Sequence, residues 1–171
     1  MPTIANQFCH LHVHSHYSLL DGVNTIPALV RSARDQGMKA LALTDHGNMF
    51  GAVEFHHACR KEGIKPIIGI EAYITDGHRQ ERKRERGKQH AFHLVLLAEN
   101  EIGYQNLIKL TSIAYTEGFY YKPRIDHEVL RKHSEGIIAT SACLSGEINR
   151  ALLHGEADKA EECARRYIDI F

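Results

Sequence analysis

The stretch ALALTDHGN, residues 40–48, joins a short apolar run to a cluster of polar residues that follows it directly. Ala40 to Thr44 has the length and the continuous apolar character of a buried parallel strand. In a parallel α/β fold, polar residues placed just after such a strand lie at the mouth of the sheet or barrel. Asp45 and His46 are therefore candidates for a functional site, although Asp and Gly also favour ordinary turns.

The segments on both sides of this stretch alternate between predicted strands and predicted helices. Upstream, residues 8–14 predict a strand, and residues 25–36 predict a helix with Pro27 in its first turn. Repeated alternation implies parallel strands joined by right-handed crossovers, so the fold class is α/β, with a doubly wound sheet or a (β/α) barrel as alternatives. Downstream, we predict strands at 66–74, 92–98 and 136–140, and helices at 51–62, 101–115, 145–153 and 156–171, with a short helix capped by Asp126.

Length and composition are those of one globular domain spanning residues 1–171, with 43% hydrophobic and 25% charged residues. Lys plus Arg and Asp plus Glu each number 21, which argues against a purely electrostatic nucleic-acid binder. The four cysteines have no C-x-x-C spacing, and the apolar runs are too short to span a bilayer. We therefore expect cysteines that are free thiols or ligands, no membrane association and a cytoplasmic location. The 13 histidines direct attention to metal chemistry.

One segment, Asp76–Lys88, has no apolar periodicity and is rich in basic residues. It is either a solvated loop or a basic arm that touches nucleic acid. Its cations are Arg79, Arg82, Lys83, Arg84, Arg86 and Lys88.

Four histidines alternate along the first predicted strand, at His10, His12, His14 and His16. Alternate residues of a strand share a face, so these imidazoles could reach a single metal site, with the carboxylate of Asp21 nearby. A chance row of histidines facing solvent is the alternative interpretation.

A second set of candidates lies on later strands. Glu71 interrupts the apolar run 67–74, where an unpaired carboxylate is costly, so it needs either a metal or a salt bridge. His93 stands at the start of its strand and, from spacing alone, reads as an edge histidine. Cys143 follows a strand and reads as a small buried residue. Mixed His and carboxylate ligands suit Zn²⁺, Mn²⁺ or Fe, whereas carboxylate and water positions suit Mg²⁺ or Mn²⁺. Paired ions of this kind favour phosphoester hydrolysis.

The sequence resembles the PHP (polymerase and histidinol phosphatase) family in the pieces His12-Val13-His14-Ser15, Thr44-Asp45-His46-Gly47-Asn48 and Gly69-Ile70-Glu71-Ala72. Further stretches, at residues 18–22, 48–55, 103–107 and 117–126, resemble the branch of this family found in bacterial replicative DNA polymerases. The resemblance implies a distorted (β/α)₇ barrel with two or three divalent ions (Zn, Mn or Mg) at its mouth. It favours His93 and Cys143 as metal ligands, and it argues against His10 and His16 as ligands. The implied metal ligands are His12, His14, Asp21, His46, Glu71, His93 and Cys143.

The same resemblance carries expectations about function. It implies a metal-dependent phosphoesterase, as a 3′–5′ proofreading exonuclease in a DNA polymerase that works with DNA and the other holoenzyme subunits. The last ligands of the family would lie beyond Phe171, so the barrel is expected to be truncated. A non-catalytic module that supports the polymerase is the main alternative, and an amidohydrolase is a remoter one. We also predict that Lys122 and Arg124 lie near the metal mouth and bind phosphate.

Overall fold

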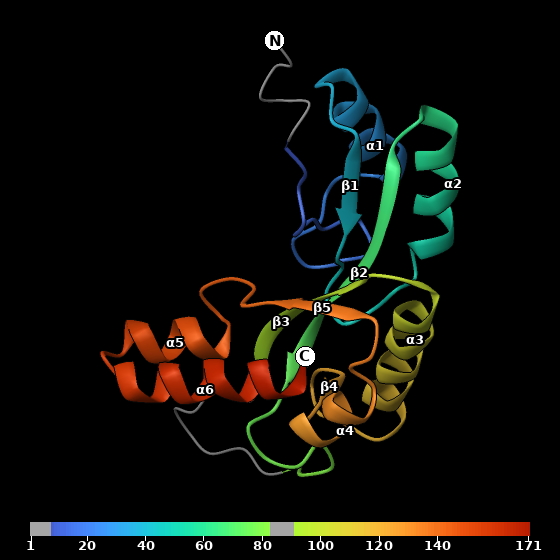
Figure 1. Cartoon of the computed structure of the whole chain (residues 1–171). Helices are drawn as coiled ribbons and strands as arrows, with labels where there is room; N and C mark the ends of the chain where they lie inside the picture. The colour runs from blue at the N-terminus through green and yellow to red at the C-terminus, as the bar shows by residue number, and fades with distance from the viewer. Residues whose placement is uncertain (1–7, 83–90) are drawn as a thin grey trace.

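The computed structural model describes residues 8–82 and 91–171, which form a mixed α/β fold around one five-stranded sheet. The strands follow the order β1-β2-β3-β5, and β4 pairs with β2 away from that path. Figure 1 shows the long strand β2 running through the molecule and linking its two halves. The strands are β1 (Ala40–Leu43), β2 (Lys65–Ile74), β3 (Phe92–Ala98), β4 (Arg124–Ile125) and β5 (Ile137–Thr140).

The first half of the fold consists of β1 and the start of β2, covered by α1 (Ile26–Asp35) and α2 (Ala52–Glu62). β1 and β2 pair in parallel, as the apolar run at residues 40–44 predicts. The helices bury one stripe each, and Val30 of α1 and Phe55 of α2 lie fully buried in the same core. Apolar residues at a spacing of three to four explain why these helices form where the sequence predicts them.

The predicted strand at residues 8–14 is wrong, because this stretch lies beside β1 without forming a regular ladder. The amides of Ala42 and Thr44 donate to the carbonyls of His10 and Val13 at 2.9 and 2.8 Å. The amide of Val13 instead donates to the hydroxyl of Thr44 at 2.8 Å. A side chain therefore takes a bond that a continuous strand would give to backbone, and the stretch stays extended but irregular.

The second half departs from the expected all-parallel arrangement. β3 pairs antiparallel with both β2 and β5, and only the two-residue strand β4 adds a further parallel pair. No described residue between β2 and β3 belongs to a helix, and parallel neighbours need a crossover connection that is usually helical. The chain therefore returns antiparallel, which places the start of β3 beside the end of β2.

Two helices cover this second half, α3 (Glu101–Thr116) and α4 (His127–Lys132). Side chains cap both N-termini, where Asn100 accepts from the amide of Gly103 and Asp126 from that of Val129, each at 3.1 Å. Their apolar faces bury Leu107, Leu110, Val129 and Leu130 against Ile70, Ile74 and Leu96 of the sheet.

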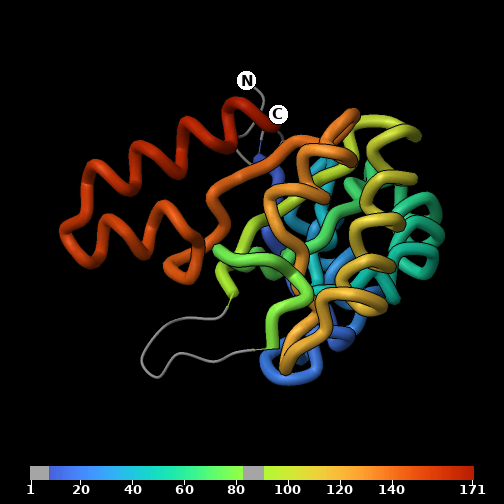
Figure 2. Tube along the Cα trace, turned by 90° about the horizontal axis from the view of Figure 1, so that it is seen from below, coloured from blue at the N-terminus to red at the C-terminus, as the bar shows by residue number. Residues whose placement is uncertain are grey.

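The last two helices, α5 (Glu147–Leu153) and α6 (Ala157–Ile170), pair with each other and project to one side of the sheet. Figure 2 shows this hairpin reaching away from the rest of the chain, with the end of α6 returning to it. Ile170 joins the main core. The buried carboxylate of Glu147 accepts from the hydroxyl of Tyr167 at 2.6 Å.

Within the described ranges, no helix combines the length and the apolar character that a membrane span needs.

Candidate metal centre

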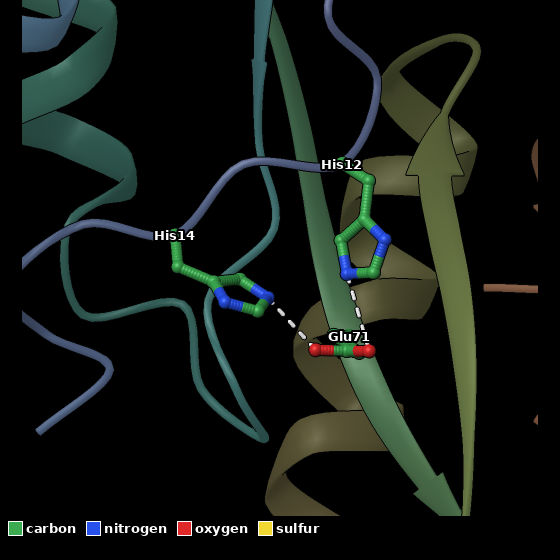
Figure 3. Close-up of side chains that lie close together, drawn as sticks. All are labelled: His12, His14 and Glu71. Atoms are coloured by element: carbon green, nitrogen blue, oxygen red, sulfur yellow. Dashed lines mark ion pairs between the residues drawn. The ribbon is translucent and has the colours of Figure 1, made fainter. Parts of the chain in front are cut away.

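The carboxylate of Glu71 is the centre of the candidate site. Its side chain lies in the middle of β2 and is 1% exposed. Four imidazoles approach it: His12 and His93 lie 3.1 and 2.8 Å from Oε1, and His14 and His46 lie 2.8 and 2.7 Å from Oε2. Figure 3 shows His12 and His14 pointing at opposite oxygens of the one carboxylate. A salt bridge to Lys or Arg, the alternative that the sequence left open, is absent among the described residues.

His46 reaches the site because the backbone after β1 continues alongside β2. The amide of Glu71 donates to the carbonyl of Asp45 at 3.0 Å, and the amide of Gly47 donates to the carbonyl of Glu71 at 2.9 Å. These bonds hold His46, which lies between Asp45 and Gly47 in the chain, directly opposite Glu71. The residues after the apolar run therefore bring His46 to the carboxylate of Glu71.

The carboxylate of Asp45 is bonded to the chain segment that follows His14 and not to the imidazoles. Its carboxylate accepts from the amide of Ser15 at 2.7 Å and from the hydroxyls of Ser15 and Ser18 at 2.8 and 2.7 Å. Because Ser15 follows His14 directly, these bonds fix the direction of the stretch that carries His12 and His14. Asp45 therefore acts as a positioning residue.

Asp21 lies at the outer edge of the cluster. Its Oδ2 is 2.9 Å from Nε2 of His46, and its Oδ1 is 4.0 Å from Nδ1 of His14. The contact with His46 holds the pKa of the Asp21 carboxyl below its usual value. Asp21 is the more accessible of the two carboxylates, because its side chain is 55% exposed whereas that of Glu71 is 1% exposed.

His93 and Cys143 join the cluster, although spacing alone ranked both of them low. His93 stands at the start of β3, and that start lies at the site because β3 is antiparallel to β2. The sulfur of Cys143, in the loop after β5, is 3.5 Å from Nδ1 of His93 and 3.6 Å from Oε1 of Glu71. The sequence also gave no signal for Tyr73, two residues after Glu71 on β2. Its ring stacks on His46 with centroids 6.1 Å apart and meets His93 edge-on at 5.2 Å.

His10 and His16 lie outside the cluster, so the expectation that all four alternating histidines share a face is wrong. His10 is exposed and packs edge-on against Phe8, and His16 lies against Tyr17. The reason is the irregular backbone of residues 8–16, in which only His12 and His14 keep a common direction.

Lys122 and Arg124, the two residues predicted to bind phosphate, lie in different surroundings. Lys122 lines the open side of the site, with its ammonium 5.3 Å from the centre of the Tyr73 ring. Arg124 is 2% exposed, and its guanidinium donates to the carbonyls of Gly118, Arg79 and Glu81. The bonds engage Nε and Nη2 inside the fold, and Arg124 does not line the cavity that Lys122 lines, so the structure does not support the phosphate prediction for Arg124.

The described part of the basic segment also has a structural role. Arg79 pairs with Glu117 at 2.7 Å and with Asp126 at 3.1 Å, and Arg82 donates to the carbonyl of Glu117. Its remaining cations, Lys83, Arg84, Arg86 and Lys88, lie outside the described residues.

The donor set fits divalent metal ions. The described residues contain four groups of potential ligand atoms that lie within 4.8 Å of one another, and three of these groups are at this site. Each two of the three share one residue, which is His14, His46 or Glu71. Nε2 of His14, Nδ1 of His46 and Oε2 of Glu71 are buried, and the short contacts between them lack hydrogen-bond geometry. Buried polar atoms without hydrogen bonds are rare, and a cation between them would satisfy all three. Burial favours the neutral form of Glu71, but the four imidazoles outweigh it and hold the pKa of Glu71 well below its usual value. The groups are His12–His14–Glu71, His14–Asp21–His46 and His46–Glu71–His93.

A cavity of about 440 Å³ opens beside these groups. Asp21, His46 and His93 line this cavity, and Tyr73 and Lys122 line it as well. A site that combines imidazoles, an exposed carboxylate, a cavity and a nearby ammonium can bind a metal ion and an anionic ligand together.

The fold and the donor set agree with the comparison to protein families, in which residues 10–171 match the PHP domain. The chain belongs to the PHP domain family.

Relatives within that family are replicative polymerase subunits. The chain is 52% identical over 164 residues to the DNA polymerase III subunit alpha of Treponema pallidum, covering 96% of this chain and 14% of that protein. It is 52% identical to that of Borreliella burgdorferi over 91% of this chain, and 47% identical to that of Aquifex aeolicus over 98%. The chain thus spans about one seventh of the length of these relatives.

The chain is also similar to solved structures, two of which follow. An amidohydrolase from Chromobacterium violaceum, solved with bound sulfate and no metal, aligns over 61% of this chain and 34% of its own at 25% identity and a TM-score of 0.43. A proposed metal-dependent phosphoesterase from Bifidobacterium adolescentis aligns over 63% of this chain and 34% of its own at 21% identity and the same TM-score.

Proposed function

We propose that this chain is the PHP domain of a bacterial DNA polymerase III alpha subunit, and that its site is a metal-dependent phosphoesterase that removes nucleotides from DNA 3′ ends. The observation that carries the proposal is the convergence of four imidazoles and one thiol on the buried carboxylate of Glu71. Identity near 50% to such subunits over almost the whole chain supports the polymerase context. The proposed ligands are His12, His14, Asp21, His46, Glu71, His93 and Cys143.

Two or three divalent ions, Zn²⁺, Mn²⁺ or Mg²⁺, would supply an activated water and neutralise charge on a phosphoester. The chain's own residues do the rest of the positioning. Glu71 sets the spacing of His14 and His46 by lying within 2.8 Å of both. Lys122 lines the cavity and would orient a phosphate beside the ligands. In the polymerase, DNA and the other holoenzyme subunits would be the partners.

The test measures release of labelled nucleotide from the 3′ end of single-stranded DNA, in a complete alpha subunit carrying this sequence and in the isolated chain. His14→Ala should abolish release in the presence of Mn²⁺ or Zn²⁺ and lower the bound metal measured by mass spectrometry. His154→Ala, at the exposed end of α5, is the matched control and should change neither. Bound metal without nucleotide release would favour the alternative, a non-catalytic module that supports the polymerase.

A further inference from the structure

The cavity beside the candidate metal centre has a second wall, and this wall is apolar and exposed. Leu19 and Leu20 are each 89% exposed, and Phe50 is 66% exposed. All three line the same cavity as Asp21 and His46. Leu19 and Leu20 come from the loop before α1 and Phe50 from the turn before α2, so they meet at the cavity through the fold.

The aromatic part of this wall continues as a row of rings. The ring of Phe50 lies 6.3 Å from that of Tyr115, and Tyr115 stacks on Phe119 at 6.2 Å with planes 28° apart. Tyr115 and Phe119 are also exposed. Scattered exposed apolar residues are ordinary, but a contiguous patch of rings marks a binding surface.

Core packing does not account for the row. The buried face of α3 consists of Leu107, Leu110 and Ala114, whereas Tyr115 and Phe119 lie outside the core cluster. The three rings stay 40% to 66% exposed, and nucleic-acid bases stack on exposed aromatic rings whatever the identity of the base.

We propose that Phe50, Tyr115 and Phe119, with Leu19 and Leu20, form a stacking surface that binds the unpaired bases of a DNA 3′ end and delivers its terminal phosphoester to the metal centre. This inference rests on the proposed function and adds the selectivity of the site. Paired bases keep their faces inside the duplex, so only a frayed or single-stranded end can use the rings. The apolar wall also supplies affinity that the chain, with a formal net charge of zero, cannot draw from bulk electrostatics.

The placement of charge agrees with this arrangement. Lys122, which would hold the phosphate, lies on the same cavity as Phe50 and Tyr115. Bases on the rings and a phosphate at Lys122 therefore fit one strand that enters from the aromatic side and ends at His46 and His93.

The test uses a short oligonucleotide with 2-aminopurine at its 3′ end and a terminal phosphorothioate linkage that slows hydrolysis, bound to the Mn²⁺-loaded chain. Stacking on the rings should quench the 2-aminopurine fluorescence. Phe50→Ala and Phe119→Ala should each weaken binding about tenfold and reduce the quenching, and Phe119→Trp should preserve both. The control Ile168→Ala removes an apolar side chain of α6 that is more exposed than either ring, at 76%, and should change nothing.

An oligonucleotide with abasic sites and the same phosphates separates stacking from charge. It should bind weakly to the wild-type chain and equally weakly to Phe50→Ala. If the abasic strand binds as tightly as the natural one, or if both alanine variants bind like the wild type, the stacking surface is refuted while DNA hydrolysis can stand. The latter result would reassign the rings to a protein partner. If the metal-loaded chain neither binds nor cleaves any of these strands, the proposed function fails, and the inference fails with it.

Discussion

Replacing Arg124 with alanine should destabilise the fold and leave phosphate recognition to Lys122. The Arg124 guanidinium is buried and donates to the carbonyls of Gly118 at 3.1 Å, Arg79 at 2.9 Å and Glu81 at 2.7 Å. Burial also lowers the pKa of Arg124. At roughly 1–1.5 kcal/mol for each bond, the substitution should remove about 3–4.5 kcal/mol from the free energy of unfolding.

Urea denaturation followed by circular dichroism measures this effect. With a slope of about 2 kcal/mol per molar urea, the midpoint of Arg124→Ala should fall by roughly 2 M. The matched variant Lys122→Ala loses a half-exposed ammonium and one cation–π contact, so its stability should change by no more than about 1 kcal/mol. Its affinity for a single-stranded oligonucleotide should fall instead. If Arg124→Ala keeps the wild-type midpoint and loses oligonucleotide binding, the structural reading of Arg124 is refuted.

Three further outcomes follow from the packing and the site. Mn²⁺ or Zn²⁺ at about one hundred times its dissociation constant should stabilise the chain by about 2.7 kcal/mol, and Glu71→Gln should abolish the resulting rise in melting temperature in calorimetry. The pKa of the Glu147 carboxyl is lowered, against the effect of burial, by His127 and Tyr167. Its stabilisation is therefore present above the unfolded-state pKa near 4.5 and is lost as pH falls below that value. The stability gap between wild type and Glu147→Gln in urea titrations should accordingly be largest above pH 4.5 and shrink as the pH falls below it. Gly103→Ala would place a Cβ 1.8 Å from the carbonyl oxygen of Gly136, so thermal melts should show a loss above about 2 kcal/mol despite alanine's better helix propensity.

The helices and the first parallel strand pair follow from sequence pattern. Apolar periodicity places α1, α2 and α3 within one or two residues of the structure. Pro27 marks the start of α1, and Gly63 marks the end of α2. Local signals of this kind do not depend on which strands are neighbours. The predicted helices are therefore correct even where the predicted arrangement of the strands is wrong.

The parts of the site that pattern missed depend on strand direction and on irregular backbone. His93 was ranked low because a strand start belongs to the wrong edge of an all-parallel sheet, and it reaches Glu71 because β3 runs antiparallel. Arg124 was misplaced because sequence does not reveal that three backbone carbonyls surround it. The resemblance to the PHP family implied that His93 and Cys143 belong to the metal site, whereas residue spacing alone did not.

Backbone strain gives an independent view of where the fold serves function. Two residues other than glycine, Tyr121 and Ala142, have positive φ angles in the described part of the chain, at 60° and 58°. Each directly precedes a residue of the proposed site, Lys122 and Cys143. A left-handed conformation costs a residue with a Cβ roughly 1–2 kcal/mol and persists only where surrounding structure enforces it. Ordinary turns would place glycine there, as the chain does at Gly63 after α2. The strained residues lie directly before Lys122 and Cys143. This placement indicates that the conformation of the two loops is set by the direction in which the Lys122 and Cys143 side chains must point.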